Sequence, residues 1–343
     1  MEHYAGIDVS LKLSSVCVRD ERGTIVREAK VASEPEALIG WFSACGLKLA
    51  LIGLEAGPLS AWLYRGMHAA GLPVRLIETR HAQVGLKLMP VKSDRNDARG
   101  LAEIMRLGWY RPVYCKSEAA QERRALLGAR VLVKTKLHDI SMHLRGQLRT
   151  FGLKVGRTTP ARFAGRVREL VGGNPMLELI AGALLKVHAE LRRQLAALHK
   201  RLLAIARQDP VVRRLMTAPA VGVIVGLTYA AAVDDPTRFR RSKQVGAYFG
   251  MTPRKYQSGE TDVDGHISKL GDASVRAVLY EAAHVLLTLP TKGGWLKSWG
   301  AKLAKRVGQR RAKVAVARKL AVVLHRMWSD GTDFAFVKPA AAA

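Results

Sequence analysis

The sequence predicts a mixed α/β domain, then a long helical hairpin, then a mainly α-helical C-terminal domain. Three observations predict this order. Short strand-like runs alternate with helical runs in the first third of the chain. Two long stretches then carry apolar residues at every third or fourth position, and a further series of helical patterns follows. We place the domains at residues 1–112, 113–208 and 209–335, and expect a disordered tail at 336–343.

The N-terminal domain begins with three strand-sized apolar runs, at 3–9, 14–19 and 24–31. The turn Asp20-Glu21-Arg22-Gly23 separates the last two, so these runs indicate a meander. Helices and strands then alternate, with helices expected at 36–45, 59–70 and 94–107 and strands at 49–54 and 74–78. The order βββαβαβα predicts an α/β domain with a central sheet.

Two long helices are expected next. The first carries Val133, Leu137, Ile140, Leu144, Leu148 and Phe151, and the second has similar spacing from Leu177 to Ile205. We expect them to pair as a coiled-coil-like hairpin and to associate protomers. The stretch 152–175 between them is expected to be an exposed connection. From Asp209 the pattern is helical to about Trp328, with a glycine-studded loop at 252–271.

Charge indicates the class of partner. The chain has 56 Lys and Arg against 28 Asp and Glu, a formal net charge of +28. Such an excess repels itself unless a polyanion neutralises it. Nucleic acid is the expected partner, although basicity alone is also compatible with ribosomal or membrane-surface binding.

Cysteine usage and hydropathy argue against a disulfide-bonded, zinc-binding, secreted or membrane protein. The three cysteines have no CxxC or Cys/His spacing, which indicates neither disulfides nor zinc and fits a reducing cytoplasm. The N-terminus lacks the pattern of a secretory signal. The uncharged stretch 215–233 is nearly long enough to span a membrane, but Pro219, Gly222 and Gly226 interrupt it and charges flank it, so no membrane association is expected.

Four carboxylates form the candidate metal site. Asp8 and Glu55 each follow an apolar strand, so they are expected to converge at one edge of the sheet. Asp94 and Asp97 are three residues apart and share one face of a helix. Asp8 is also compatible with a turn cap, or with the first strand of an actin-like sugar kinase, and Asp94 with a helix cap.

The number of acids in so basic a chain favours metal binding. Four converging carboxylates repel each other by several kcal/mol unless a cation binds them. Hard oxygen ligands select Mg²⁺ or Mn²⁺. Two such ions stabilise both the attacking and the leaving oxygen of a phosphodiester, which is the chemistry of nucleases and strand transfer.

These motifs resemble a known family. The combination Gly6-Ile7-Asp8, Leu54-Glu55-Ala56-Gly57 and Lys92-Ser93-Asp94-x-x-Asp97-Ala98-Arg99 resembles the DEDD transposases of the insertion-sequence "one-ten" family, which are bridge-RNA-guided recombinases. The resemblance implies an RNase H-like (RuvC-like) N-terminal domain. It continues in Arg238-Phe239, Gly250-Met251-Thr252-Pro253-Arg254, Tyr256-Gln257-Ser258-Gly259 and Ile267-Ser268-Lys269-x-Gly271-Asp272, and it is weakest between about 116 and 208.

The resemblance also assigns a nucleophile. By itself Ser258 before Gly259 is an ordinary turn residue. The resemblance implies that Ser258 attacks a DNA phosphate and forms a phosphoserine intermediate, in a composite site that carboxylates from a different protomer complete. The acids in Glu260-Thr261-Asp262-Val263-Asp264 depart from the family pattern. They either face away from DNA, which we favour, or help to hold metal.

Basic residues in the C-terminal domain are expected to contact nucleic acid. One amphipathic helix is expected over 302–319, with a cationic face. The turn Ala218-Pro219-Ala220-Val221-Gly222-Val223 is compatible with both a degenerate helix-hairpin-helix motif and a buried apolar hairpin. The predicted contact residues are Arg238, Arg240, Arg241, Lys243, Arg254, Lys269, Lys305, Arg306, Arg310 and Lys313.

The family resemblance implies the partners. They are double-stranded DNA at the element ends and at the target, a structured guide RNA, and further copies of the chain, as dimers that pair into tetramers. Such an enzyme would act in the bacterial cytoplasm, associated with the nucleoid. The rival interpretations are a RuvC-like endonuclease that uses metal-activated water without Ser258, and a noncatalytic nucleic-acid scaffold. A sugar kinase is disfavoured because the chain has no second glycine-rich phosphate loop in the right place.

Overall fold

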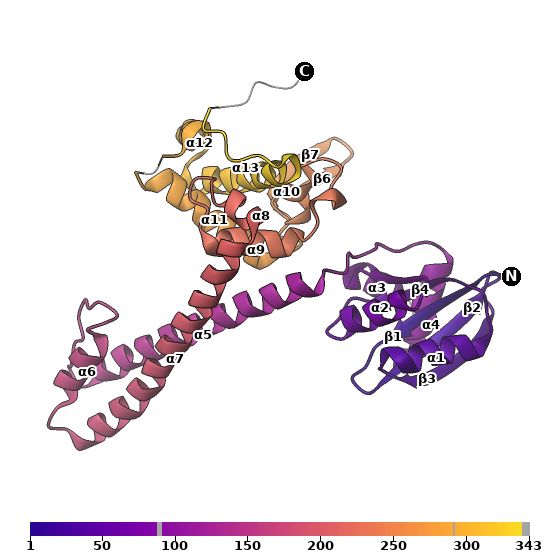
Figure 1. The fold of residues 1–343 in the computed structure, drawn as a ribbon, viewed down its shortest axis with the longest axis horizontal. Coiled ribbons are helices and arrows are strands. Elements are labelled where there is room, and N and C mark those ends of the chain that lie inside the picture. The colour runs from indigo at the N-terminus through magenta and orange to yellow at the C-terminus, as the bar shows by residue number, and fades with distance from the viewer. Residues whose placement is uncertain (88–90, 291, 338–343) are drawn as a thin grey trace. The chain divides into compact units, whose positions relative to one another are not determined.

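The computed structural model of the protein describes residues 1–87, 91–290 and 292–337 (Figure 1). The chain divides into two compact units, residues 1–116 and 117–343, which we call the N-terminal and C-terminal units. Of the tail expected at 336–343, residues 338–343 lie outside the described residues.

A five-stranded sheet forms the centre of the N-terminal unit, in the order β3-β2-β1-β4-β5. The first three strands are antiparallel neighbours, which confirms the meander, and β4 and β5 run parallel to β1. Strands were predicted at all five places. Their bounds are β1 (His3–Asp8), β2 (Leu13–Asp20), β3 (Ile25–Ala32), β4 (Leu49–Glu55) and β5 (Val74–Ile77).

Helices cover both faces of this sheet. The helices α1 (Pro35–Cys45) and α2 (Ser60–Ala69) share one apolar core with β1 to β5, whereas α4 (Asp94–Arg106) packs against β1, β2 and β4 through separate clusters. Because side chains alternate along a strand, Ala5 and Ile7 belong to the first core. A short helix, α3 (Thr79–Leu86), was not predicted.

The C-terminal unit begins with the expected helical hairpin. The helices α5 (Glu118–Thr150) and α7 (Pro175–Gln208) pack against each other. The connection between them differs from the prediction, because it contains α6 (Phe163–Val171), whose Phe163, Val167 and Val171 are buried in the hairpin core. Their spacing of four residues places them on one helix face. Figure 1 shows α6 at the end of the hairpin, away from the helices that follow α7 in the chain.

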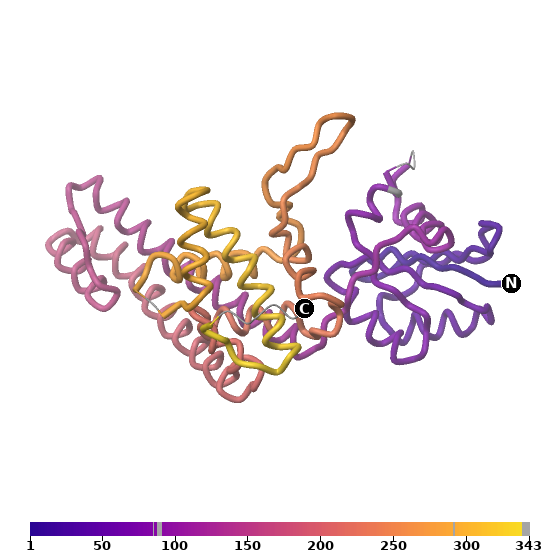
Figure 2. Tube along the Cα trace, turned by 90° about the horizontal axis from the view of Figure 1, so that it is seen from above, coloured from indigo at the N-terminus to yellow at the C-terminus, as the bar shows by residue number. Residues whose placement is uncertain are grey.

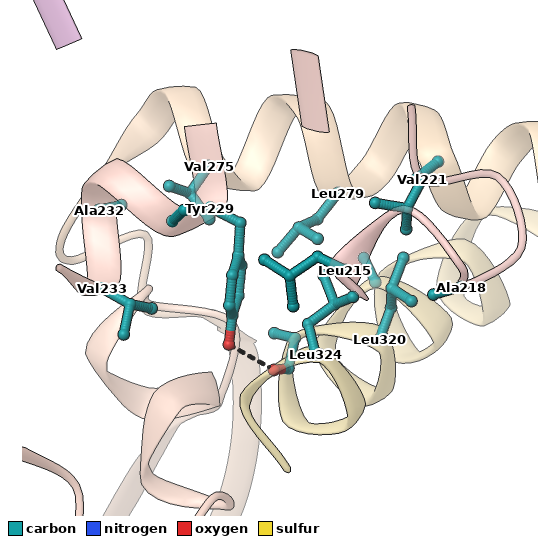
Figure 3. Packing of buried hydrophobic residues seen from close by; sticks show 14 of the residues in the cluster. Leu215, Ala218, Val221, Tyr229, Ala232, Val233, Val275, Leu279, Leu320 and Leu324 are labelled. Atoms are coloured by element: carbon teal, nitrogen blue, oxygen red, sulfur yellow. Dashed lines mark hydrogen bonds between the residues drawn. The ribbon is translucent and has the colours of Figure 1, made fainter. Parts of the chain in front are cut away.

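The remaining helices surround one apolar core (Figure 3). The apolar stretch 215–233 contains α9 (Val223–Val233), whose Tyr229 is fully buried and donates a hydrogen bond of 2.7 Å to the Ala321 carbonyl. In the described part of the chain, no helix is long and apolar enough to cross a membrane. The helices around this core are α8 (Pro210–Leu215), α9 (Val223–Val233), the 3-10 turn η1 (Pro236–Arg238), α10 (Gln244–Tyr248), α11 (Ala273–Thr288), α12 (Gly294–Val307) and α13 (Gln309–Asp330).

Two further predictions about the C-terminal unit were wrong. The glycine-studded loop at 252–271 contains a β-hairpin, β6 (Pro253–Ser258) and β7 (Thr261–Ile267), which projects from its unit in Figure 2. The cationic helix expected over 302–319 is two helices, α12 and α13. They separate at Gly308, whose φ of 82° lies in the left-handed region that favours glycine.

Candidate active site

Strand alternation places two of the candidate acids on the face that α4 covers. On β1, Gly6 and Asp8 lie on the side opposite to the buried Ile7, and on β4 Gly53 and Glu55 follow the same alternation. Gly6 pairs with Gly53 in the parallel register. Asp8 and Glu55 are the last residues of adjacent parallel strands, so both lie at the same edge of the sheet.

Two glycines allow α4 to lie directly on this sheet. A Cβ atom on Gly6 would lie 2.3 Å from the Ala102 nitrogen and 2.4 Å from the Ala98 carbonyl oxygen. A Cβ atom on Gly53 would lie 2.5 Å from Cγ of Met105. Contacts this short do not occur, so a larger residue at Gly6 would displace the backbone of the helix, whereas one at Gly53 would first displace the Met105 side chain.

The N-terminus of α4 brings the other two acids to the same edge. The Ser93 hydroxyl caps the helix by accepting a hydrogen bond of 3.2 Å from the Asn96 N–H. Asp94 and Asp97 follow in the first turn. Because Ser93 performs the capping, Asp94 is not the N-cap residue, although its place in the first turn is one where the helix dipole stabilises an acid.

Electrostatics show that the four acids interact. Burial, followed by the neighbouring charges of Asp97, Asp94 and Glu55 in that order, raises the pKa of Asp8 to about 6. Burial also raises the pKa of Glu55, as does the charge of Asp97, while a hydrogen bond from Thr79 opposes the rise. The four carboxylates therefore repel each other, and a bound cation would remove this repulsion.

The four carboxylates are ligands that suit a hard divalent cation, but they are not gathered around one point. Carboxylate oxygens are the ligands such ions prefer. Within residues 1–87, 91–290 and 292–337, no three His, Cys, Asp or Glu side chains lie close enough to share one metal ion. Binding of an ion would therefore have to draw the carboxylates together. Asp8 and Glu55 line a pocket of about 350 Å³ with Ser10, Leu11 and Ser60.

Glu28 anchors the acid-bearing helix, and sequence reasoning missed it. From β3 it accepts hydrogen bonds from Arg99 Nε at 2.5 Å and from Arg95 Nε at 2.9 Å. The hydrogen bond from Arg99 is the main cause that lowers the pKa of Glu28 to about 2. The available signal was the pair of arginines four residues apart on α4, interleaved with Asp94 and Asp97.

Ser258 lies in a very different setting. It ends β6 and pairs with Thr261 across a tight turn in which Gly259 has a φ of 55°. All residues of β6 are exposed, and those of β7 are exposed except Ile267, which is half-buried. Of the acids expected near the serine, Asp262 forms an ion pair of 3.0 Å with Lys255 across the hairpin.

Close backbone contacts and hydrogen bonds hold the hairpin at its root. A Cβ atom on Gly250 would lie 1.9 Å from the Leu270 carbonyl oxygen. The two segments at the root of the hairpin are therefore so close that only glycine fits at this position. The Lys269 N–H donates a hydrogen bond of 3.0 Å to the Gly250 carbonyl. From α11, Arg276 Nη1 donates to the carbonyls of Phe249, Leu270 and Gly271 at 3.1, 3.2 and 3.0 Å.

Comparisons with known proteins match both regions. A family model described as a DEDD transposase of the IS110 type matches residues 5–152, and one described as "Transposase IS116/IS110/IS902 family" matches 212–293. The transposase for insertion sequence element IS1111A of Coxiella burnetii is 30% identical over 331 residues, which cover 93% of this chain and 87% of the relative. The chain belongs to this family of transposases.

Other relatives agree with this assignment of the transposase. A "Probable family 20 transposase" of Pseudomonas aeruginosa is 27% identical, covering 83% of this chain and 85% of the relative. The transposase for insertion sequence element IS1328 of Yersinia enterocolitica is 24% identical with the same coverage. The family resemblance inferred from the motifs is confirmed, the protein is a DNA transposase, and the sugar-kinase interpretation is wrong.

The transposase presents most of its predicted nucleic-acid contacts to solvent. Arg240, Arg241, Lys243, Arg254, Lys269, Lys305, Arg306 and Arg310 are exposed, while Lys313 is half-buried. Arg238 differs, because its Nη1 donates a hydrogen bond of 2.8 Å to the Val233 carbonyl and its guanidinium lies over the Tyr248 ring. In the 218–223 turn, Ala218 and Val221 are buried in the core, which favours the apolar-hairpin interpretation. The assignment of these residues to DNA or RNA stays a prediction.

Proposed function

We propose that this transposase cuts and rejoins DNA at Ser258, with Asp8, Glu55, Asp94 and Asp97 of an RNase H-like (RuvC-like) domain binding Mg²⁺ or Mn²⁺. The observation that carries the proposal is the convergence of four acids from β1, β4 and α4, with the pKa of Asp8 raised to about 6. Carboxylates placed for structure alone are normally paired with bases, as Glu28 is with Arg99.

The reaction is a transfer of a phosphodiester bond. The Ser258 hydroxyl gives up its proton and its Oγ attacks phosphorus, so that a serine–phosphate bond forms while the bond to one deoxyribose oxygen breaks. That oxygen leaves and takes up a proton. Attack by the hydroxyl of a second DNA strand reverses the exchange and releases the serine. Divalent metal supplies positive charge against the negative charge that develops on the phosphate oxygens.

The exposure of Ser258 supports this role for it. A nucleophile that must reach a phosphate of duplex DNA has to lie on an accessible element, and the β6–β7 hairpin is exposed on both faces. A hydroxyl is weakly nucleophilic without a base or metal beside it. Two residues near it in sequence that could act as a base, His266 and Lys269, are exposed like the serine itself. Activation is therefore assigned to the metal-binding carboxylates.

Ser258→Ala tests the serine, with Thr261→Ala as the matched control because Thr261 is the hydroxyl residue paired with it. Purified transposase is incubated with element-end DNA and Mn²⁺, and protein–DNA adducts are resolved on denaturing gels. We expect Ser258→Ala to lose both adduct and recombination and Thr261→Ala to retain them. Intact cleavage by Ser258→Ala would instead establish the endonuclease that uses metal-activated water.

The carboxylates are tested separately. Asp8→Asn and Glu55→Gln each remove one charge from the proposed metal site, and we expect losses of about 10³-fold or more in strand exchange. Glu103→Gln is the matched control, since Glu103 lies on α4 and forms an ion pair with Arg106. Unchanged strand exchange in Asp8→Asn and Glu55→Gln would show that the acids do not take part in chemistry.

The wider assembly is also proposed. We assign residues 1–112 to the metal-binding domain, 113–208 to the hairpin through which protomers associate, and 209–335 to the domain with the serine. The expected partners are double-stranded DNA, a structured guide RNA, and further copies as dimers and tetramers at the bacterial nucleoid. The net charge of +28 supports the nucleic-acid partners. Sequencing of RNA that copurifies with the protein tests the guide, and light scattering tests the oligomer.

A further inference from the structure

The end of the helical hairpin holds a cleft that the proposed chemistry does not use. It has a volume of about 720 Å³, within the range of ligand-binding pockets. It lies between the loop that leaves α5 and the first two turns of α6. The residues that line it are Val155, Arg157, Thr158, Thr159, Ala161, Arg162, Gly165, Arg166 and Glu169.

Arginines of the long helices fix the wall of this cleft. Arg145 of α5 donates hydrogen bonds to the Gly156 carbonyl at 2.6 Å and to the Thr158 hydroxyl at 3.1 Å. Arg192 of α7 donates to the Pro160 carbonyl at 3.0 Å. Val155 is buried in the hairpin core and anchors the same loop. The loop is therefore ordered before any ligand binds, which lowers the entropic cost of binding.

The charge around the cleft is strongly positive. Residues 152–171 contain five basic side chains and one acid, a net charge of +4. Arg166 pairs with that acid, Glu169, at 3.1 Å. Among the described residues, no carboxylate lies within ion-pair distance of Arg157 or Arg162, and both are exposed. Arg145 and Arg192 are bound to neutral oxygens, so their charges also stay uncompensated.

The cleft itself is open on the side of α6. A Cβ atom on Gly165 would meet nothing within 4 Å, so the glycine leaves space between Arg162 and Arg166. Guanidinium groups bind phosphate through two parallel N–H donors, which suits them to a backbone that passes through a concave surface. Small apolar lining at Val155 and Ala161 fits the sugars between phosphates.

We propose that this cleft binds the phosphodiester backbone of a nucleic acid, with Arg157 and Arg162 contacting phosphates. The chemistry that it recognises is common to DNA and RNA. The site lies in the helical hairpin, apart from both the carboxylates and Ser258 along the chain, so it contributes affinity and register rather than catalysis.

The double substitution Arg157→Gln and Arg162→Gln in the full-length protein tests the cleft. Affinities are measured by fluorescence anisotropy for a labelled DNA duplex and for an RNA duplex of the same sequence, over a series of NaCl concentrations. Each lost phosphate contact lowers the slope of log affinity against log salt by about 1, so we expect a decrease of about 2 with the nucleic acid that occupies the cleft. A duplex whose slope stays unchanged is not the nucleic acid that binds in the cleft.

Arg168→Gln is the matched control, because Arg168 is exposed on α6 and does not line the cleft. A second test leaves the arginines intact: Gly165→Glu places a carboxylate in the open space, with Gly128→Glu on exposed α5 as its control. Loss of affinity in the cleft variants alone supports the site. Slopes that stay unchanged with both duplexes, or equal losses in the controls, overturn it.

Discussion

The carboxylates of the N-terminal unit lie at the ends of two strands and at the start of a helix that packs tightly on them, whereas Ser258 of the C-terminal unit lies in a ribbon with almost no buried residue. Ile7 and Leu54, which precede Asp8 and Glu55, are fully buried. The positions of the acids are therefore set by a hydrophobic core, and small changes in packing should move them.

The position of the serine has a different physical origin. A two-stranded ribbon without a hydrophobic face is marginally stable in water, so β6 and β7 depend on the glycines and Arg276 at their root. Such an arrangement is stiff at its base and accessible at its tip. The two regions should therefore respond to different substitutions: the acids to changes beneath α4, and the serine to changes at the root of the hairpin.

The largest effect is expected for Gly6→Ala. The added Cβ would lie 2.3 Å from the Ala102 nitrogen, so α4 must move off the sheet. We expect a loss of about 3 kcal/mol in the free energy of unfolding, measured by urea denaturation, together with the loss of strand exchange. Gly40→Ala on α1 is the control because its Cβ meets nothing within 4 Å, and we expect a gain of about 0.5 kcal/mol. Equal stability of the two variants would contradict the packing argument.

A smaller effect is expected for Arg276→Gln at the root of the hairpin. The substitution removes a charged donor shared by the carbonyls of Phe249, Leu270 and Gly271, at a cost of about 2 kcal/mol. Strand exchange should fall by at least tenfold while DNA affinity, measured by anisotropy, changes little. Arg326→Gln, which removes only an exposed ion pair with Asp330, should change neither. Parallel losses of affinity and exchange would assign Arg276 to DNA binding instead.

The predictable parts of the site were those that depend on local patterns. The apolar strands before Asp8 and Glu55, and the three-residue spacing of Asp94 and Asp97, were evident from the sequence because each is set within a few residues. Ser258 was assigned only through the family resemblance. The β6–β7 hairpin was missed because a ribbon exposed on both faces has no reason to alternate apolar and polar residues.

Contacts between distant residues could not be predicted. Glu28 pairs with Arg95 and Arg99, which are 67 and 71 residues away, and the partner of an exposed-looking acid cannot be chosen from sequence when 56 basic residues are available. The break at Gly308 was missed for another reason. Apolar spacing continues on both sides of it, so a change in helix direction leaves the periodicity almost unaltered.

Glu28→Gln sharpens the description of how α4 is held. The loss of this carboxylate leaves Arg95 and Arg99 free to pair with Asp94 and Asp97, in competition with metal. We expect about a tenfold weaker affinity for Mn²⁺ in calorimetric titrations, with the fold retained. Glu103→Gln makes the same chemical change at the other end of α4, beside Arg106, and should leave Mn²⁺ affinity unaltered. A similar weakening in both variants would show general loosening of the helix.

The smallest effect is expected for Asp8→Asn in metal-free protein. The folded state raises the pKa of Asp8 from 3.8 to about 6, so its ionisation costs stability as the pH rises between these values, and the full cost is present above about pH 6. Removing the charge should therefore raise the Tm of the metal-free protein by about 3 °C at pH 7.5. The gain is modest because the carboxyl is half-exposed and screened by solvent.

At pH 4, where Asp8 is largely protonated in the folded state, the same substitution should leave the Tm unchanged. Saturating Mn²⁺ at pH 7.5 should reverse the order of the two proteins, since bound cation stabilises the charged site and the variant binds it weakly. These measurements use differential scanning calorimetry of the full chain with and without chelator. A variant that is less stable than the wild type in chelator at pH 7.5 would show that Asp8 serves the fold, because a carboxylate kept for a metal should cost stability until the metal is bound.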